Sequence, residues 1–97
     1  MIVEHAWLTI TPGREDEFFD SITSVLPLIE ATPGCHGAEL RRQIENPSIF
    51  LLMVRWDSVD AHMAFRASVP FETWKAHTAP FYGAPSEVTH FSEVLSS

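Results

Sequence analysis

The spacing of apolar side chains changes several times along this 97-residue chain, and each change predicts a new structural element. Residues 2–10 are rich in β-branched and aromatic side chains and end at Thr11-Pro12-Gly13, which predicts a strand followed by a turn. Beyond this turn, apolar residues recur at intervals of three and four, which is typical of the buried face of an amphipathic helix. These residues are Phe18, Ile22, Val25 and Ile29.

This first helix is expected to span about residues 14–32. Three acidic residues in its first turn favour a helix start, because negative charge is stabilised at the positive end of the helix dipole. Pro27 is expected to bend the helix or to end its regular part early, since proline lacks the N–H that the helix needs. Pro33-Gly34 is expected to stop it.

A hairpin is predicted in the middle of the chain. Residues 35–45 alternate weakly between apolar and polar side chains, and Asn46-Pro47 is a tight-turn sequence. Residues 49–54 then form an uninterrupted apolar run that fits a buried strand.

A second helix is predicted after the hairpin. Ser58 is a good helix N-cap, so we expect this helix over about residues 59–67. Pro70 is expected to interrupt it, and residues 71–77 are expected to form another short helical piece.

The chain is predicted to close with a loop over residues 80–85 and a strand over residues 88–95. The resulting order β-α-β-β-α-β is that of the ferredoxin-like α+β sandwich, in which one antiparallel sheet carries two helices on a single face. The apolar run at residues 49–54 is hydrophobic on both faces, although helices are available for only one. We therefore expect a second copy of the chain to cover the other face, which makes the protein a homodimer.

Length and composition fit a single domain over residues 1–97 with a real core, because 45% of the residues are hydrophobic and 11% are aromatic. The formal net charge of −7, with no basic stripe, argues against nucleic-acid binding. The lone Cys35 cannot close an intrachain disulfide, and neither a secretory signal nor a membrane-spanning segment is evident. We therefore expect a cytoplasmic protein that is not in a membrane.

Several short motifs together resemble the antibiotic biosynthesis monooxygenase family of small dimeric α+β barrel proteins. The motifs are Pro12-Gly13, Phe18, Pro33-Gly34-Cys35, Phe50, Trp56-Asp57-Ser58, Ala61-His62, Phe71 and Trp74. Each motif is weak alone, but their order and spacing cover nearly the whole chain. The resemblance implies a dimer whose sheets enclose a barrel, with a small pocket between sheet and helices in each protomer.

The resemblance also implies a class of chemistry. Characterised members oxidise polycyclic phenols or quinols with molecular oxygen and use neither a metal nor a flavin, whereas one branch degrades haem. The haem-degrading branch requires an Asn, a Trp and a His at places that correspond here to Ala6, Phe65 and Lys75. Because none of the three is retained, we do not expect haem degradation, and we expect no cofactor.

Two histidines are candidates for proton transfer, because a neutral imidazole can accept a proton near neutral pH. His62 is the preferred base, since it follows the first turn of the second helix, which in this fold leans over the pocket. The alternative is that His62 is a half-buried residue on an amphipathic face. His77 lies three residues after Trp74, and this pair is expected either to close the mouth of the pocket or to pack a loop.

Aromatic residues are candidates for binding a planar ring. Trp7, Phe65 and Phe71 are candidates for stacking walls, with core packing as the default interpretation of each. Trp74 is expected near the ligand. Tyr82, the only tyrosine, is a candidate donor to a substrate oxygen, and the alternative is a place on the surface.

No metal site is expected. His5 and His90 lie on the first and last strands, which are neighbours in this fold and could bring the two rings together. Two histidines without a suitably spaced carboxylate nevertheless fall short of a zinc or iron site. Cys35 and His36 are adjacent in a strand and so point to opposite faces, which argues against a Cys–His nucleophile.

The leading hypothesis is a homodimeric, cofactor-independent monooxygenase that oxidises a small phenolic, quinol or polyketide-type aromatic with molecular oxygen. A second hypothesis is a non-catalytic module that binds an apolar metabolite in the same pocket. A third is an isomerase or cyclase of the same architecture.

Overall fold

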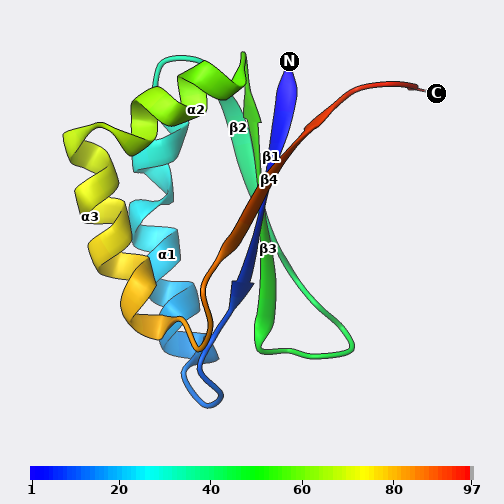
Figure 1. The fold of residues 1–97 in the computed structure, drawn as a ribbon. Helices are drawn as coiled ribbons and strands as arrows, with labels where there is room; N and C mark the ends of the chain where they lie inside the picture. Colours follow the sequence, from blue (N-terminus) through cyan, green and yellow to red (C-terminus); the bar gives the residue numbers. More distant parts are fainter. Residues whose placement is uncertain (97) are drawn as a thin grey trace.

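The computed structural model describes residues 1–96, which form one antiparallel sheet and a layer of helices (Figure 1). The elements along the chain are β1 (Ile2–Thr9), α1 (Glu15–Glu30), β2 (Cys35–Arg42), β3 (Ile49–Trp56), α2 (Val59–Arg66), α3 (Val69–Thr78), a short 3-10 turn η1 (Ala79–Phe81) and β4 (Glu87–Ser92). The strand order is β2-β3-β1-β4, and the helices lie on one face of the sheet. The predicted ferredoxin-like α+β fold is confirmed.

The first helix is continuous, contrary to the expected effect of Pro27. This residue lies inside α1 and is exposed, and the helix runs on to Glu30. Val25 and Ile29, on either side of the proline, are both buried in the core. Packing of this apolar face therefore holds the last turn in helical form despite the missing N–H.

Pro70 starts a helix instead of interrupting one. It lies in the first turn of α3, where a proline costs little because the first N–H groups of a helix have no partner in the helix. The closing strand is shorter than predicted, since β4 ends at Ser92 instead of residue 95. None of the helices within residues 1–96 has the length and apolar run needed to cross a bilayer.

The two faces of the sheet have different surroundings. In β3, fully buried residues alternate with half-buried ones, and the buried set faces the helices. In β1 the even-numbered residues are buried in the same way, so the odd-numbered residues point to the opposite face, which no helix within residues 1–96 covers. Trp7 on this outer face remains 40% exposed. The expectation of apolar side chains on both faces of the sheet is confirmed.

The connection from β3 into α2 is built on close backbone contact. Ser58 caps α2 as predicted, because its hydroxyl accepts a hydrogen bond of 3.2 Å from the Ala61 amide. The Asp57 amide donates to the Gly34 carbonyl over 2.8 Å, which ties this turn to the start of β2. Gly34 has a φ of +87°, and a Cβ atom there would lie 2.8 Å from the Ala61 Cβ.

We predict that Gly34→Ala lowers the free energy of unfolding by at least about 2 kcal/mol, because the left-handed backbone and the contact with Ala61 both oppose a side chain. Gly13→Ala is the matched control, since Gly13 has a similar φ of +92° and open space around it. Only the backbone cost of about 1 kcal/mol is expected there. Urea denaturation followed by circular dichroism measures both, and equal losses would contradict the role of the Ala61 contact.

Candidate active site

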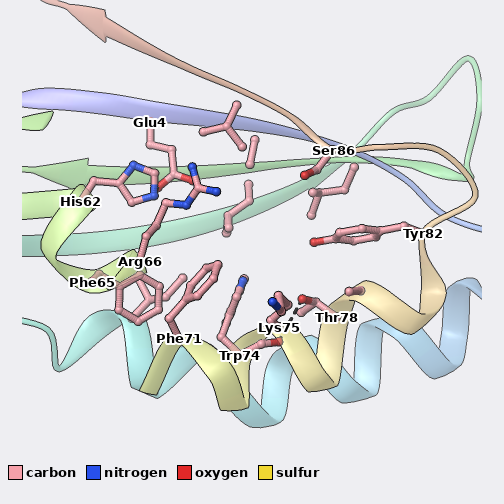
Figure 2. A pocket seen from close by; sticks show the side chains of 16 residues that line it. Glu4, His62, Phe65, Arg66, Phe71, Trp74, Lys75, Thr78, Tyr82 and Ser86 are labelled. Carbon is pink, nitrogen blue, oxygen red and sulfur yellow. Dashed lines mark hydrogen bonds and ion pairs between the residues drawn. The ribbon is translucent and has the colours of Figure 1, made fainter. Parts of the chain in front are cut away.

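A cavity of about 200 Å³ lies between the helix-facing side of the sheet and the helices α2 and α3 (Figure 2). Strands β1, β3 and β4 contribute the sheet side, and α2, α3, the loop after η1, and single residues of α1 and η1 contribute the rest. This volume is below the range of about 300–1,000 Å³ that is typical of drug-sized ligands. It therefore suits a molecule of one ring better than a polycycle.

A chain of three polar side chains lies at one end of this cavity. Glu4 on β1 and His62 on α2 are both buried, and Glu4 Oε1 lies 3.2 Å from His62 Nε2. His62 Nδ1 in turn lies 2.8 Å from His90 Nε2 on β4. Three elements that are distant in sequence thus bring one carboxylate and two imidazole rings into contact.

Trp56 fixes the position of the central pair. Its indole Nε1 donates to Glu4 Oε1 over 2.9 Å, and its ring stacks on His62 with centroids 5.2 Å apart. The Nε2 side of the His62 ring therefore faces Glu4, and its Nδ1 side faces His90.

Burial shifts the proton affinities of Glu4 and His62 in opposite directions. Desolvation raises the pKa of Glu4, although the Trp56 hydrogen bond and the charge of Arg66 oppose the shift. Desolvation lowers the pKa of His62 to about 4, and the charges of His90 and Arg66 add to this effect. Glu4 is thus a stronger base than an ordinary glutamate, and His62 is a weaker base than an ordinary histidine.

One oxygen of Glu4 has no protein partner. Oε1 lies near Trp56 and His62, whereas Oε2 has no hydrogen-bond partner among residues 1–96. Within the same residues no sealed side-chain N or O atom lacks a partner, so Oε2 is not sealed from its surroundings. Because Glu4 lines the cavity, its carboxyl group is placed at the edge of the space that a bound molecule would fill.

Hydroxyl groups lie at the other end of the cavity, around Thr78, Tyr82 and Ser86 (Figure 2). The Tyr82 side chain projects from the loop after η1 into the cavity, as a donor to a substrate oxygen would. Burial raises the pKa of the Tyr82 phenol, and a hydrogen bond with Thr78 partly opposes this. The phenol therefore stays protonated and can donate.

The predicted aromatic wall is present in part. Phe65, Phe71 and Trp74 all line the cavity, with Phe65 and Phe71 packed edge to face at 5.5 Å. Trp7 does not join them, because it is an odd-numbered residue of β1 and points to the outer face of the sheet. The sequence correctly predicted that Trp7 lies on the first strand. The face of the sheet to which its side chain points was not considered.

His77 also lies away from the cavity, although it was paired with Trp74 in the sequence. It is exposed, and its Nδ1 lies 2.9 Å from the Thr73 carbonyl of its own helix. The cavity side of α3 is instead marked by Trp74, Lys75 and Thr78. With 3.6 residues per helical turn, Lys75 and Thr78 lie to one side of Trp74 around the helix axis, and this side faces the cavity. His77 lies to the other side of Trp74 and points away from the cavity.

His5 and His90 do not meet. Glu4, not His5, is the register partner of His90, so the two histidine rings point to opposite faces of the sheet. The His5 ring instead contacts Phe91 in a tilted arrangement, with centroids 4.5 Å apart. His36 contacts Asp57 at the surface. Among residues 1–96, no group of three His, Cys, Asp or Glu side chains is placed to hold a metal ion.

Several residues of the site were missed from the sequence, among them Glu4, His90 and Arg66. Glu4 alternates in step with the buried Leu8 and Ile10, and this alternation was the available signal that it points inward. His90 becomes a partner of His62 only through the pairing of β4 with β1. Arg66 follows His62 by four residues on α2, and its access to the cavity depends on how α2 packs.

Comparisons with known proteins agree on one family. The antibiotic biosynthesis monooxygenase family profile matches residues 1–77. The uncharacterised protein YczJ of Bacillus subtilis (strain 168) is 34% identical over 95 residues, which cover 97% of this chain and all of that protein.

Solved structures give the same result. A Bordetella bronchiseptica protein, provisionally assigned as an antibiotic biosynthesis monooxygenase, has a TM-score of 0.93 and 38% identity over 97% of each chain. A variant of SnoaB, a cofactor-independent oxygenase from Streptomyces nogalater, has a TM-score of 0.85 and 17% identity over 98% of this chain and 94% of that chain. The SnoaB likeness concerns the fold alone.

The three places that correspond to the essential residues of the haem-degrading branch can now be located. Ala6, Phe65 and Lys75 all line the cavity. The resemblance therefore led to the right region of the chain, and the side chains there differ from those that haem degradation requires.

We predict that stability depends on pH through His62. Its pKa is about 4 in the folded chain and 6.5 when unperturbed, so between these values the unfolded chain binds a proton that the folded chain does not. The free energy of unfolding therefore decreases as the pH falls through this interval, by about 1.4 kcal/mol for each pH unit.

Glu4 also contributes to the pH dependence, because its raised pKa changes stability with pH in the opposite sense. Comparing the native chain with His62→Gln separates the contribution of His62 from that of Glu4. Between pH 7.5 and 4.5, about 2–3 kcal/mol less stability is lost in His62→Gln than in the native chain. His77→Gln, which removes an exposed histidine, serves as the control. Urea denaturation at each pH measures the free energy of unfolding. An equal loss of this free energy in the native chain and in His62→Gln would contradict the burial of a neutral His62.

Proposed function

The chain belongs to the antibiotic biosynthesis monooxygenase family, and from this premise we propose that it catalyses cofactor-independent oxidation of a small phenol or quinol by molecular oxygen. The observation that carries this proposal is a buried carboxylate with raised pKa that lines a cavity together with the aromatic side chains of Phe65, Phe71 and Trp74. Proton removal is the step that such a reaction demands of the protein.

The reaction needs few protein groups. A phenol that loses its proton becomes an electron-rich phenolate, which can donate an electron to oxygen without a metal or flavin. Recombination of the resulting radical pair gives a peroxide, and loss of water leaves the quinone. Overall, the phenol loses four electrons, and one oxygen atom of O₂ enters the quinone while the other leaves as water.

Glu4 is the proposed proton acceptor, with His62 as a positioning residue. Both ring nitrogens of His62 are occupied, by Glu4 and by His90, so neither is open to a substrate. The direction of the pKa shifts supports the same choice, since burial strengthens Glu4 as a base and weakens His62. His62 and His90 connect the carboxylate to the half-buried edge of β4, where a proton can be exchanged with solvent.

The remaining cavity residues are proposed to hold the ring. Phe65, Phe71 and Trp74 offer apolar contact area and exclude water, which strengthens the remaining polar contacts. Tyr82 is positioned to donate to a substrate oxygen. The volume of about 200 Å³ favours a single-ring phenol or quinol over a polyketide-type polycycle.

We also propose that the protein is a homodimer through the outer face of the sheet. This face carries Trp7 and Phe91, which are 40% and 52% exposed, next to the half-buried Leu51 and Met53. Trp7 and Leu51 are register partners, so their side chains lie side by side at its centre. A second copy would bury this apolar area, as a standard interface of about 800 Å² per partner does. The cytoplasmic location predicted from the lone Cys35 remains part of this proposal.

We predict that Leu51→Glu converts the dimer to a monomer, because a charge at the centre of the outer face would have to be buried without a partner. Val69→Glu is the control, since Val69 is 82% exposed at the start of α3 on the helical side of the molecule. Sedimentation equilibrium at micromolar concentration separates the two states. A native chain that sediments as a monomer would contradict the proposed dimer.

We predict that Glu4→Gln lowers kcat for quinol oxidation by about two to three orders of magnitude, because the amide keeps the shape but cannot take the proton. KM is expected to change little. An oxygen electrode with a panel of hydroquinones measures the rate, and addition of a chelator is expected to leave it unchanged. His77→Gln is expected to keep the native rate, since His77 lies outside the cavity.

Other outcomes select the alternatives. Native activity in Glu4→Gln would contradict the assigned base. Binding of a quinol to the native chain without oxygen uptake would favour a binding module, and conversion of a ligand without oxygen uptake would favour an isomerase or cyclase.

A further inference from the structure

Two cationic side chains line the cavity of a strongly acidic protein. Arg66 on α2 and Lys75 on α3 are among only six Lys and Arg residues in a chain with net charge −7. Three of the other four, Arg14, Arg41 and Arg55, form ion pairs with glutamates. Within residues 1–96, neither Arg66 nor Lys75 has a carboxylate within 4.0 Å.

The charge of the cavity is therefore unbalanced. Its only acidic lining residue is Glu4, and His62 is neutral at physiological pH because its pKa is about 4. Even with Glu4 ionised, one positive charge is in excess. Figure 2 shows Arg66 extending from α2 toward the Glu4 end and Lys75 on α3 between Trp74 and Thr78.

Balancing the charge of Glu4 does not account for both cations. A structural partner of Glu4 would lie within ion-pairing distance, whereas Arg66 only lowers the pKa of Glu4 from farther away. Lys75 has no acidic neighbour in the cavity lining. Both residues are exposed to solvent at the cavity, and neither has a carboxylate partner among residues 1–96 that would occupy its hydrogen-bond donors.

We infer that the ligand of this cavity is a single-ring aromatic acid, whose carboxylate is bound by Arg66 and Lys75 while its ring contacts Phe71 and Trp74. This inference rests on the proposed function, because it places the phenolic hydroxyl of the same molecule at Glu4. Guanidinium binds carboxylate through paired hydrogen bonds, and an ammonium adds a third donor group. One excess positive charge matches a single carboxylate better than a phosphate dianion. The local positive charge would also attract such an anion against the net charge of the protein.

The test compares two ligands of nearly equal shape, para-hydroxybenzoate and para-hydroxybenzamide, by isothermal titration calorimetry with the full chain. We expect the acid to bind about tenfold more tightly than the amide, because only the acid forms charge-assisted hydrogen bonds. Arg66→Gln and Lys75→Gln should each reduce this preference several-fold and leave the affinity for the amide within about twofold.

Matched controls keep the result interpretable. Arg14→Gln removes the same charge from a partly exposed position at the start of α1, outside the cavity lining, and is expected to keep the full preference. Arg66→Lys retains a positive charge and should keep most of it, and thermal melting confirms that each variant is folded. Equal affinity for acid and amide, an unchanged preference in both glutamine variants, or tighter binding of phenyl phosphate would overturn the inference.

Oxygen uptake with gentisate, a quinol that carries a carboxylate, separates this inference from the proposed function. A preference for the acid without any oxygen uptake would support the aromatic-acid ligand and contradict the oxygenase. Oxygen uptake with neutral hydroquinones together with equal affinity for acid and amide would support the oxygenase and overturn the aromatic-acid ligand.

Discussion

The burial of Glu4 on the helix-facing side of β1 is the constraint on which the site depends. A buried carboxylate costs several kcal/mol unless it is hydrogen-bonded, and here the Trp56 indole supplies a donor while His62 Nε2 lies 3.2 Å away. Those partners come from the end of β3 and from the first turn of α2, which the Ser58 cap holds in place. The turn at Gly34 and Asp57 thus positions the residues that keep Glu4 in its cavity.

The sheet separates two different surfaces. Its inner face carries the buried core and the polar chain of Glu4, His62 and His90, and its outer face carries exposed aromatic residues. The alternation of a single strand produces this division, since Glu4 and Trp7 are three residues apart and point in opposite directions. One strand therefore contributes both to the proposed chemistry and to the proposed dimer.

The fold belongs to its family, but part of the cavity lies outside the family match. The family profile ends at residue 77, and Tyr82, Ser86 and His90 all follow it. The haem-degrading positions hold Ala6, Phe65 and Lys75, of which Lys75 supplies positive charge to the cavity. Function therefore has to be argued from the groups in the cavity and not from the scaffold.

The sequence by itself determined the order of elements, the buried face of α1 and the Ser58 cap. It also determined that both faces of the sheet are apolar. These features depend on local spacing and on turn chemistry. The sequence also identified Phe65, Phe71, Trp74, Tyr82 and His62 as residues near the cavity. Only the tertiary structure decided that Glu4 and His90 meet His62, that Trp7 and His77 point elsewhere, and that α1 continues past Pro27. Contacts between strands and helices that are distant in sequence depend on register and packing, and local patterns do not encode these.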